Sequence, residues 1–226
     1  ISAQQIEVED VIVIETGLTN WYESVLQAGA AFEAQRQMKK YLGEDIAPED
    51  RADSFRHVYW NLDLYWRFVY LNGFSISRIE TWTDAHECVR HGVPDVTDQN
   101  CLATKYANKG WNDPQVRARI QLSNKMDLAN NKWALDYAIQ NMSGIITSTG
   151  FDIVPNAIGE RVSKLILNGS KPYSGIKVIV DVDPNIVPSY ATDCVTTRRS
   201  LGETKVRYSC LVPIEEHPDN KKPCLK

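Results

Sequence analysis

Residues able to do acid–base chemistry gather in three short stretches of this sequence: "SFRHVYW", "TDAHE" and "MDLANN". An imidazole can take up or release a proton near neutral pH, and a neighbouring carboxylate can fix its tautomer. The chain holds only four histidines, and two of them fall within these stretches. The side chains that we consider as site candidates are Arg56, His57, Asp84, His86, Glu87, Asp127 and Asn131.

If the three stretches meet, His57 can act as the general base that activates a water molecule. In this hypothesis Asp84 or Asp127 orients the imidazole. Glu87 is a second acid or base once it is desolvated, and Arg56 stabilises the anion that forms. A histidine and carboxylates on helices, without a nucleophilic Ser or Cys, suit the hydrolysis of an ester, phosphodiester or glycosidic bond.

A divalent metal ion is the second use that these side chains suggest, because hard cations such as calcium bind carboxylate and amide oxygens. The candidate ligands are His57, His86, Glu87, Asp127 and Asn131. A zinc-peptidase helix is disfavoured, since "HECVR" ends in Arg where that motif needs a second histidine. The sequence contains no G-x-S-x-G, P-loop or G-x-G-x-x-G motif, so esterase-type, nucleotide and dinucleotide sites have no support.

Helix-forming segments must carry the three stretches, and capping residues and glycines mark where these segments begin and end. His57 has Asp53 four residues before it and Asn61 four residues after it, so all three share one helix face. The alternative to a functional His57 is therefore a core histidine that hydrogen-bonds Asp53 or another helix. The predicted helices are 19–43, 47–73, 77–92, 112–142 and 156–168, and a turn-rich loop is expected over 92–112.

The residue pattern changes after Ser174, where segments rich in β-branched residues alternate with Pro and Gly turns. We therefore predict an α+β fold, with a mainly helical body and a small, disulfide-stapled antiparallel β element at the C-terminal end. The helical domain is expected to cover 1–172, with a short strand or extended arm at 6–14. The β hairpin element and a tail, packed on that domain, are expected at 173–226.

The five cysteines predict two local disulfides, because no CxxC spacing indicates a metal site. Cys88 and Cys101 flank a turn-rich stretch, and Cys194 and Cys210 flank the predicted hairpin. Each loop closure stabilises a fold by roughly 3 kcal/mol. Cys224 is left without a local partner.

Two glycosylation sequons, at Asn141 and Asn168, fit a secreted or extracytoplasmic glycoprotein, and a cytosolic protein with unpaired thiols is the alternative. The net charge of −4 and the lack of a basic stripe argue against nucleic acid as a partner. No apolar run approaches the roughly 18–20 residues of a membrane span. The expected partner is a small or polymeric extracellular ligand that the sequence does not specify.

In this order, "DSFRHVYWN", "TDAHE" and "MDLANN" resemble the signature of a bacterial domain-of-unknown-function family. The resemblance covers about 51–137. It implies a mainly helical fold, and members often occur in exported or toxin-like proteins. The residues that fall on the family pattern are Arg56, His57, Trp60, Asn61, Asp84, His86, Glu87, Asp127, Asn130 and Asn131.

One position departs from that pattern, because this chain has Ala129 where the family commonly has a histidine. If that histidine is a ligand or base in relatives, the site here is degenerate. The resemblance thus leaves a second hypothesis open beside the hydrolase. The protein would then be a non-catalytic secreted binding or structural protein that reuses the same scaffold.

Overall fold

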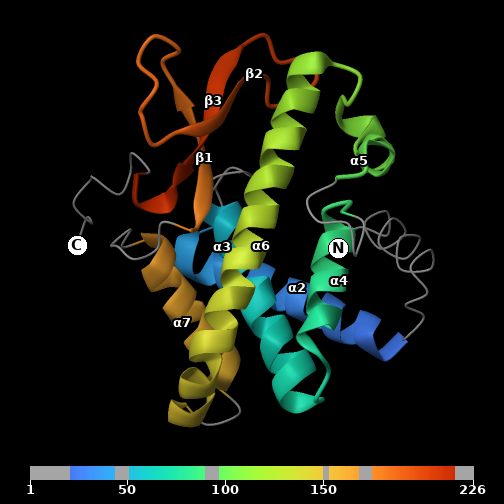
Figure 1. Ribbon diagram of the computed structural model, residues 1–226, viewed down its shortest axis with the longest axis vertical. Coiled ribbons are helices and arrows are strands. Elements are labelled where there is room, and N and C mark those ends of the chain that lie inside the picture. The colour runs from blue at the N-terminus through green and yellow to red at the C-terminus, as the bar shows by residue number, and fades with distance from the viewer. Residues whose placement is uncertain (1–20, 44–50, 90–96, 150–152, 168–174, 217–226) are drawn as a thin grey trace.

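The computed structural model describes residues 21–43, 51–89, 97–149, 153–167 and 175–216. These residues form a mainly helical body with a three-stranded antiparallel sheet at the C-terminal end (Figure 1), which confirms the predicted α+β class. The helices are α2 (Trp21–Leu42), α3 (Arg51–Leu64), the π-helix η1 (Tyr65–Leu71), α4 (Ile76–His86), α5 (Gln99–Lys105), η2 (Ala107–Lys109), α6 (Pro114–Ser148), α7 (Val154–Leu167) and η4 (Ile214–Glu216). The strands are β1 (Lys177–Val182), β2 (Thr192–Thr197) and β3 (Arg207–Pro213). The arm predicted at 6–14 lies outside the described residues.

Helix α3 is the centre of the body and packs against α2, α6 and α7. Twelve of its fourteen residues are buried, so it has no solvent-facing side on which to place polar groups. Its apolar residues, such as Phe55 and Val58, join the main core. Its buried polar residues, which include Asp53, His57 and Asn61, must therefore find partners on neighbouring elements.

Helix α6 runs along the long axis of the molecule and connects α3 with the sheet (Figure 1). It begins where the sequence predicts, because the Asp113 side chain accepts hydrogen bonds from the amides of Gln115 and Val116, and Pro114 occupies the first helical position. Its 35 residues correspond to a rod of about 50 Å. One helix thus reaches both the body and the β element.

The sheet has the order β1-β3-β2, and its first strand is fastened to the helices by side chains. Asn130 of α6 accepts a hydrogen bond from the Lys177 amide at 2.7 Å and donates to the Lys177 carbonyl at 3.0 Å. The Ser54 hydroxyl of α3 donates to the same carbonyl at 2.7 Å. The start of β1 is therefore tied to both helices that carry the predicted site.

Both predicted disulfides are present. Cys88 is bonded to Cys101, and Cys194 of β2 is bonded to Cys210 of β3. Cys224 lies outside the described residues, as does the sequon residue Asn168. Asn141 lies inside α6, and its amide nitrogen donates to the Tyr137 carbonyl at 2.9 Å, so glycosylation there stays a prediction. Among the described helices, none is long and apolar enough to cross a membrane.

The structure differs from three expected boundaries: α4 ends early, the predicted loop contains a helix, and α6 continues past 142 to Ser148. The predicted helix 77–92 ends at His86, because Cys88 adopts a left-handed conformation with φ of 58° that no α-helix can continue. The predicted loop 92–112 contains α5, whose first turn is capped by Asp98. Glu87 therefore lies at the C-cap of α4, where its amide still donates to the Thr83 carbonyl at 3.2 Å.

Candidate functional site

The proton on the His57 ring is placed by a chain of amide hydrogen bonds between α3 and α6. Asn61 Nδ2 donates to the backbone carbonyl of His57 at 2.9 Å, which fixes that end of the amide as the donor. The same nitrogen donates to Asn131 Oδ1 at 2.8 Å. Asn131 Oδ1 lies 3.0 Å from His57 Nδ1, and since an amide oxygen can only accept, Nδ1 must carry the proton. The neutral ring therefore presents the lone pair of Nε2.

The Nε2 atom faces two carboxylates. Asp127 Oδ1 lies 3.3 Å from it and Asp53 Oδ1 lies 3.8 Å from it. The ligand atoms of Asp53, His57 and Asp127 all lie within 4.8 Å of one another, and all three residues are buried. Asp127 Oδ1 has no hydrogen-bond partner in the described part of the chain. Three acceptors thus lie close together, and one of them, Asp53 Oδ1, also accepts a hydrogen bond from Arg56 Nη2. A proton, a water molecule or a cation between them would satisfy the remaining lone pairs.

Glu87 completes the negative charge of the cluster from the other side of the ring. Its Oε1 atom lies 3.8 Å from His57 Nδ1 and 3.8 Å from His86 Nε2. The second oxygen, Oε2, accepts a hydrogen bond from Asn124 Nδ2 at 2.9 Å. Glu87 is 1% exposed, and its Oε1 has no hydrogen-bond partner among the residues described. A buried carboxylate oxygen therefore faces the two histidines without accepting a hydrogen bond from the described residues.

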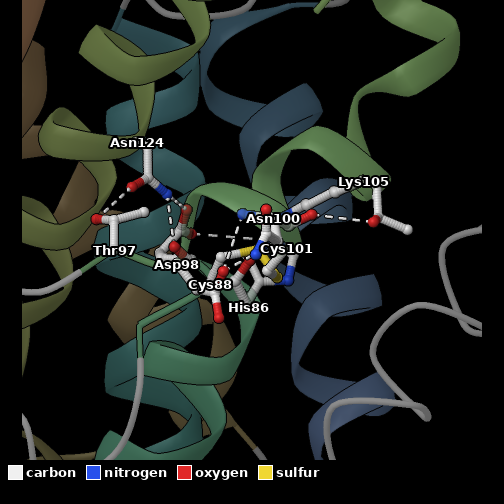
Figure 2. Close-up of a disulfide and its surroundings, with 10 residues drawn as sticks. His86, Cys88, Thr97, Asp98, Asn100, Cys101, Lys105 and Asn124 are labelled. Carbon is white, nitrogen blue, oxygen red and sulfur yellow. Dashed lines mark hydrogen bonds and ion pairs between the residues drawn. A yellow bond between two sulfur atoms is a disulfide. The ribbon is translucent and has the colours of Figure 1, made fainter.

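The turn that carries Glu87 is held by three consecutive carbonyls, each with its own donor (Figure 2). The His86 carbonyl accepts from Lys105 Nζ, the Glu87 carbonyl from Asn124 Nδ2 at 2.8 Å, and the Cys88 carbonyl from the Asp98 amide at 2.7 Å. The disulfide from Cys88 to α5 fixes the same turn. These contacts replace the donors that a continued helix would have supplied.

Burial and like charges shift the two central titrating groups in opposite directions. Burial lowers the pKa of His57, although Glu87 and Asp53 oppose this effect. Burial raises the pKa of Asp127 well above its ordinary value, and the neighbouring charges of Asp53 and Glu87 raise it further. In the absence of a cation, the imidazole is therefore favoured as neutral and Asp127 as protonated.

The structure brings most of the predicted site residues together. His57, Glu87, Asp127 and Asn131 form the cluster, with His86 beside it because α4 ends at that residue. The three carboxylates within 4 Å of the His57 nitrogens do not include Asp84, which is partly exposed.

Two further positions differ from the roles that the sequence suggested. Arg56 forms an ion pair with Asp53 and so offsets part of the negative charge of the cluster. Ala129 follows Asp127 by two residues, which places it about 200° around α6. A histidine at that position would point away from Asp127, so the geometry of the cluster does not depend on it.

Two residues of the cluster were not among the candidates. Asp53 was expected only as a hydrogen-bond partner of a core histidine. Its spacing of four residues from His57 was the signal that could have placed it in the cluster. Asn124 lies one turn before Asp127 on α6, but its contact is with a turn 37 residues earlier in the chain, which no local pattern reveals. Asn130, by contrast, is structural, because both its polar groups bind the Lys177 backbone.

Comparison with known proteins places these residues in a family. A family model described as "Domain of unknown function (DUF6973)" matches residues 15–162, which is more than half of the chain. The chain belongs to this family. The matched region contains every residue of the cluster, whereas the C-terminal sheet lies beyond it. Neither a curated protein nor a solved structure shows significant similarity to the chain.

Proposed function

We propose that Asp53, His57 and Asp127 bind a divalent metal ion and that the protein is a metal-dependent hydrolase acting outside the cytoplasm. The observation that carries this proposal is the convergence of three acceptor atoms, one of which is a histidine nitrogen whose lone pair is fixed by Asn131. A metal-binding histidine commonly donates its other N–H to an oxygen in this way. Two disulfides support an oxidising compartment.

The donor set and its spacing fit one ion. Two ligands of a metal ion at 2.0–2.2 Å lie about 3–4 Å apart, and Nε2 of His57 lies 3.3 Å and 3.8 Å from the two carboxylate oxygens. One imidazole with two carboxylates suits zinc or manganese and does not select between them. A cation would also offset the like charges that otherwise raise the pKa of Asp127.

The residues around the triad suit hydrolysis. A bound ion lowers the pKa of a water molecule that it holds. Glu87 Oε1, on the Nδ1 side of the ring, accepts no hydrogen bond within the described residues, and we assign it as the general base that takes the proton of that water through one intervening water molecule. Two buried donors that also lack partners in the described ranges, Trp60 Nε1 and Asn131 Nδ2, can stabilise the oxyanion that forms. The bond cleaved remains an ester, phosphodiester or glycosidic bond.

The first test is metal binding to chelator-treated protein, measured by calorimetry with zinc, manganese and calcium. We expect one ion per chain, with binding lost in His57→Gln and Asp127→Asn. Asp84→Asn, on the neighbouring helix but outside the cluster, is the matched control and should bind as the parent does. The absence of binding for all three ions, or binding that survives both substitutions, would refute the proposal.

The second test is turnover of aryl ester, phosphodiester and glycoside substrates by the metal-loaded protein. We expect one class to be hydrolysed, and Glu87→Gln to lower kcat about 10²–10⁴-fold while metal binding is retained. If metal binds but Glu87→Gln hydrolyses its best substrate as fast as the parent, Glu87 is not the general base.

A non-catalytic role is the second candidate, and the burial of the cluster favours it. The side chains of Asp53, His57 and Asp127 are only 6%, 9% and 11% exposed. In this alternative the ion or shared proton simply holds α3 against α6 in a secreted binding or structural protein. It predicts that metal raises thermal stability and that no substrate class is turned over.

A further inference from the structure

A cavity of about 370 Å³ lies between α5, α6 and β2, next to the cluster but separate from its metal ligands. Gln99 and Leu102 of α5 form one wall, Gln121 and Asn124 of α6 form the floor, and Asp193 of β2 forms the opposite wall. Its volume lies within the range of small-molecule sites in proteins.

Among the described residues that line this cavity, no charge is unbalanced. Lys125 and Asp193 neutralise each other through an ion pair of 2.7 Å. The remaining polar groups are amides and one hydroxyl, and Gln121 donates to Gln99 across the cavity edge at 2.8 Å. Amides offer donors and acceptors side by side, which matches hydroxyl and acetamido groups. Leu122 is one of the apolar side chains that can pack against C–H groups.

The walls are held in shape by backbone features and by both disulfides. The register of β2 against β3 shifts between Thr192 and Val195, so the strand bulges at the cavity. Asp193, within this bulge, adopts a φ of 47°, which is uncommon for a residue other than glycine. Cys194 lines the cavity and is bonded to β3, while the other disulfide anchors α5 beside Leu102. The cavity is therefore preformed.

Side chains of the cavity lead directly to the cluster. The Thr97 hydroxyl, which lines the cavity, donates to Asn124 Oδ1 at 3.3 Å. The amide nitrogen of the same Asn124 donates to Glu87 Oε2. Because Asn124 itself lines the cavity, one side chain separates a ligand there from the carboxylate that we assign as general base.

We infer that this cavity binds an uncharged saccharide unit. The described residues of its lining offer neutral hydrogen-bonding groups next to apolar side chains and no net charge for an anion or cation. If this saccharide is part of the substrate, the bond cleaved is the glycosidic one among the three candidates; this step rests on the proposed function. The binding of a saccharide in the cavity does not rest on the proposed function.

The test is an NMR titration of the full chain with N-acetylglucosamine, following the side-chain amides of Gln99, Gln121 and Asn124. Glucosamine and glucuronate are the cationic and anionic comparators. We expect saturable shifts with the neutral sugar and at least tenfold weaker binding of both charged sugars. Ala118→Phe, which fills the cavity, should abolish the shifts, while Ala129→Phe on the same helix should retain them. Gln121→Leu should weaken binding about two- to tenfold, the effect of one lost hydrogen bond.

The outcomes separate this inference from the proposed function. Binding of the neutral sugar by His57→Gln, which should not hold metal, supports the cavity independently of catalysis. The inference is wrong if the neutral sugar causes no saturable shift, if Ala118→Phe binds as well as Ala129→Phe, or if charged sugars bind equally. Metal binding and turnover remain open to their own tests in each of these cases.

Discussion

At the scale of single residues, the main feature of the site is that the Nε2 atom of His57 carries no proton when the ring is neutral. The Asn61–Asn131 pair leaves His57 Nε2 without a proton, and that atom faces two carboxylates. Burial alone does not set the pKa of Asp127, because the neighbouring charges of Asp53 and Glu87 raise it further. The chemistry of His57 therefore depends on the hydrogen bonds of Asn61 and Asn131, which we call the amide relay, as much as on the titrating groups.

Asn131→Leu tests that relay. Without the Asn131 oxygen, Nδ1 loses its acceptor and the ring is free to adopt the other tautomer, which turns a proton toward the ion. We expect the metal affinity to fall about 10–100-fold although all three ligands are present. Calorimetry measures the affinity, and ¹⁵N chemical shifts of the ring report the tautomer. An unchanged affinity would mean that Asn131 only packs the two helices together.

Asp127→Asn tests the raised pKa in metal-free protein. A carboxyl whose pKa is higher in the folded state stabilises the fold at low pH, and that contribution is lost as pH rises above its unfolded value of about 4. The advantage of Asp127→Asn over the parent should therefore grow as pH rises from about 4 toward neutrality.

Urea unfolding at several pH values measures this difference. Burial also raises the pKa of Asp63, to about 6, but this group is present in both proteins and so cancels in the comparison. The lowered pKa of His57 acts in the opposite sense, since its contribution is lost as pH falls. An advantage that stays flat or shrinks with rising pH would contradict the assignment.

At the scale of elements, the end of α4 decides where Glu87 points. Three neighbouring carbonyls and one disulfide hold this turn, and Glu87 Oε1 lies 3.8 Å from His57 Nδ1 of α3. The matched test compares the two disulfides, which span 13 and 16 residues. Cys88→Ser/Cys101→Ser and Cys194→Ser/Cys210→Ser should each cost about 3 kcal/mol. Only the first pair should speed hydrogen exchange at 86–89, and equal exchange in both would show that the disulfide does not position Glu87.

The elements also show what the sequence could and could not predict. The start of α6 was predictable because Asp113 and Pro114 are a local capping signal. The end of α4 was not, because the left-handed residue that ends it is a cysteine, and no Gly or Asn marks the position. Helix α5 has only seven residues in a Gly- and Pro-rich stretch, too few for a periodic pattern to show. The candidate side chains were identified, but which of them meet depends on these tertiary constraints.

At the scale of the whole molecule, the site lies where α3 meets α6, and the first strand of the sheet is hydrogen-bonded to both helices. Asn130→Ala removes the link from α6 to β1 but no group of the cluster. We expect a loss of about 1–2 kcal/mol in unfolding free energy, because the Lys177 amide loses its side-chain partner. Metal affinity, measured by the same calorimetry, should change less than threefold. A large loss of affinity would place the sheet in direct control of the site.

The links from Lys177 have a practical consequence for the boundaries of the protein. The family match ends at residue 162, inside α7, yet the central core also contains Ile176, Val178, Val212 and Ile214. A shorter version that stopped at the family boundary would expose the apolar surface beneath these residues to water. It would also leave Asn130 buried without its strand. Such a fragment would retain every ligand of the triad in its sequence and lack the support that brings them to one point.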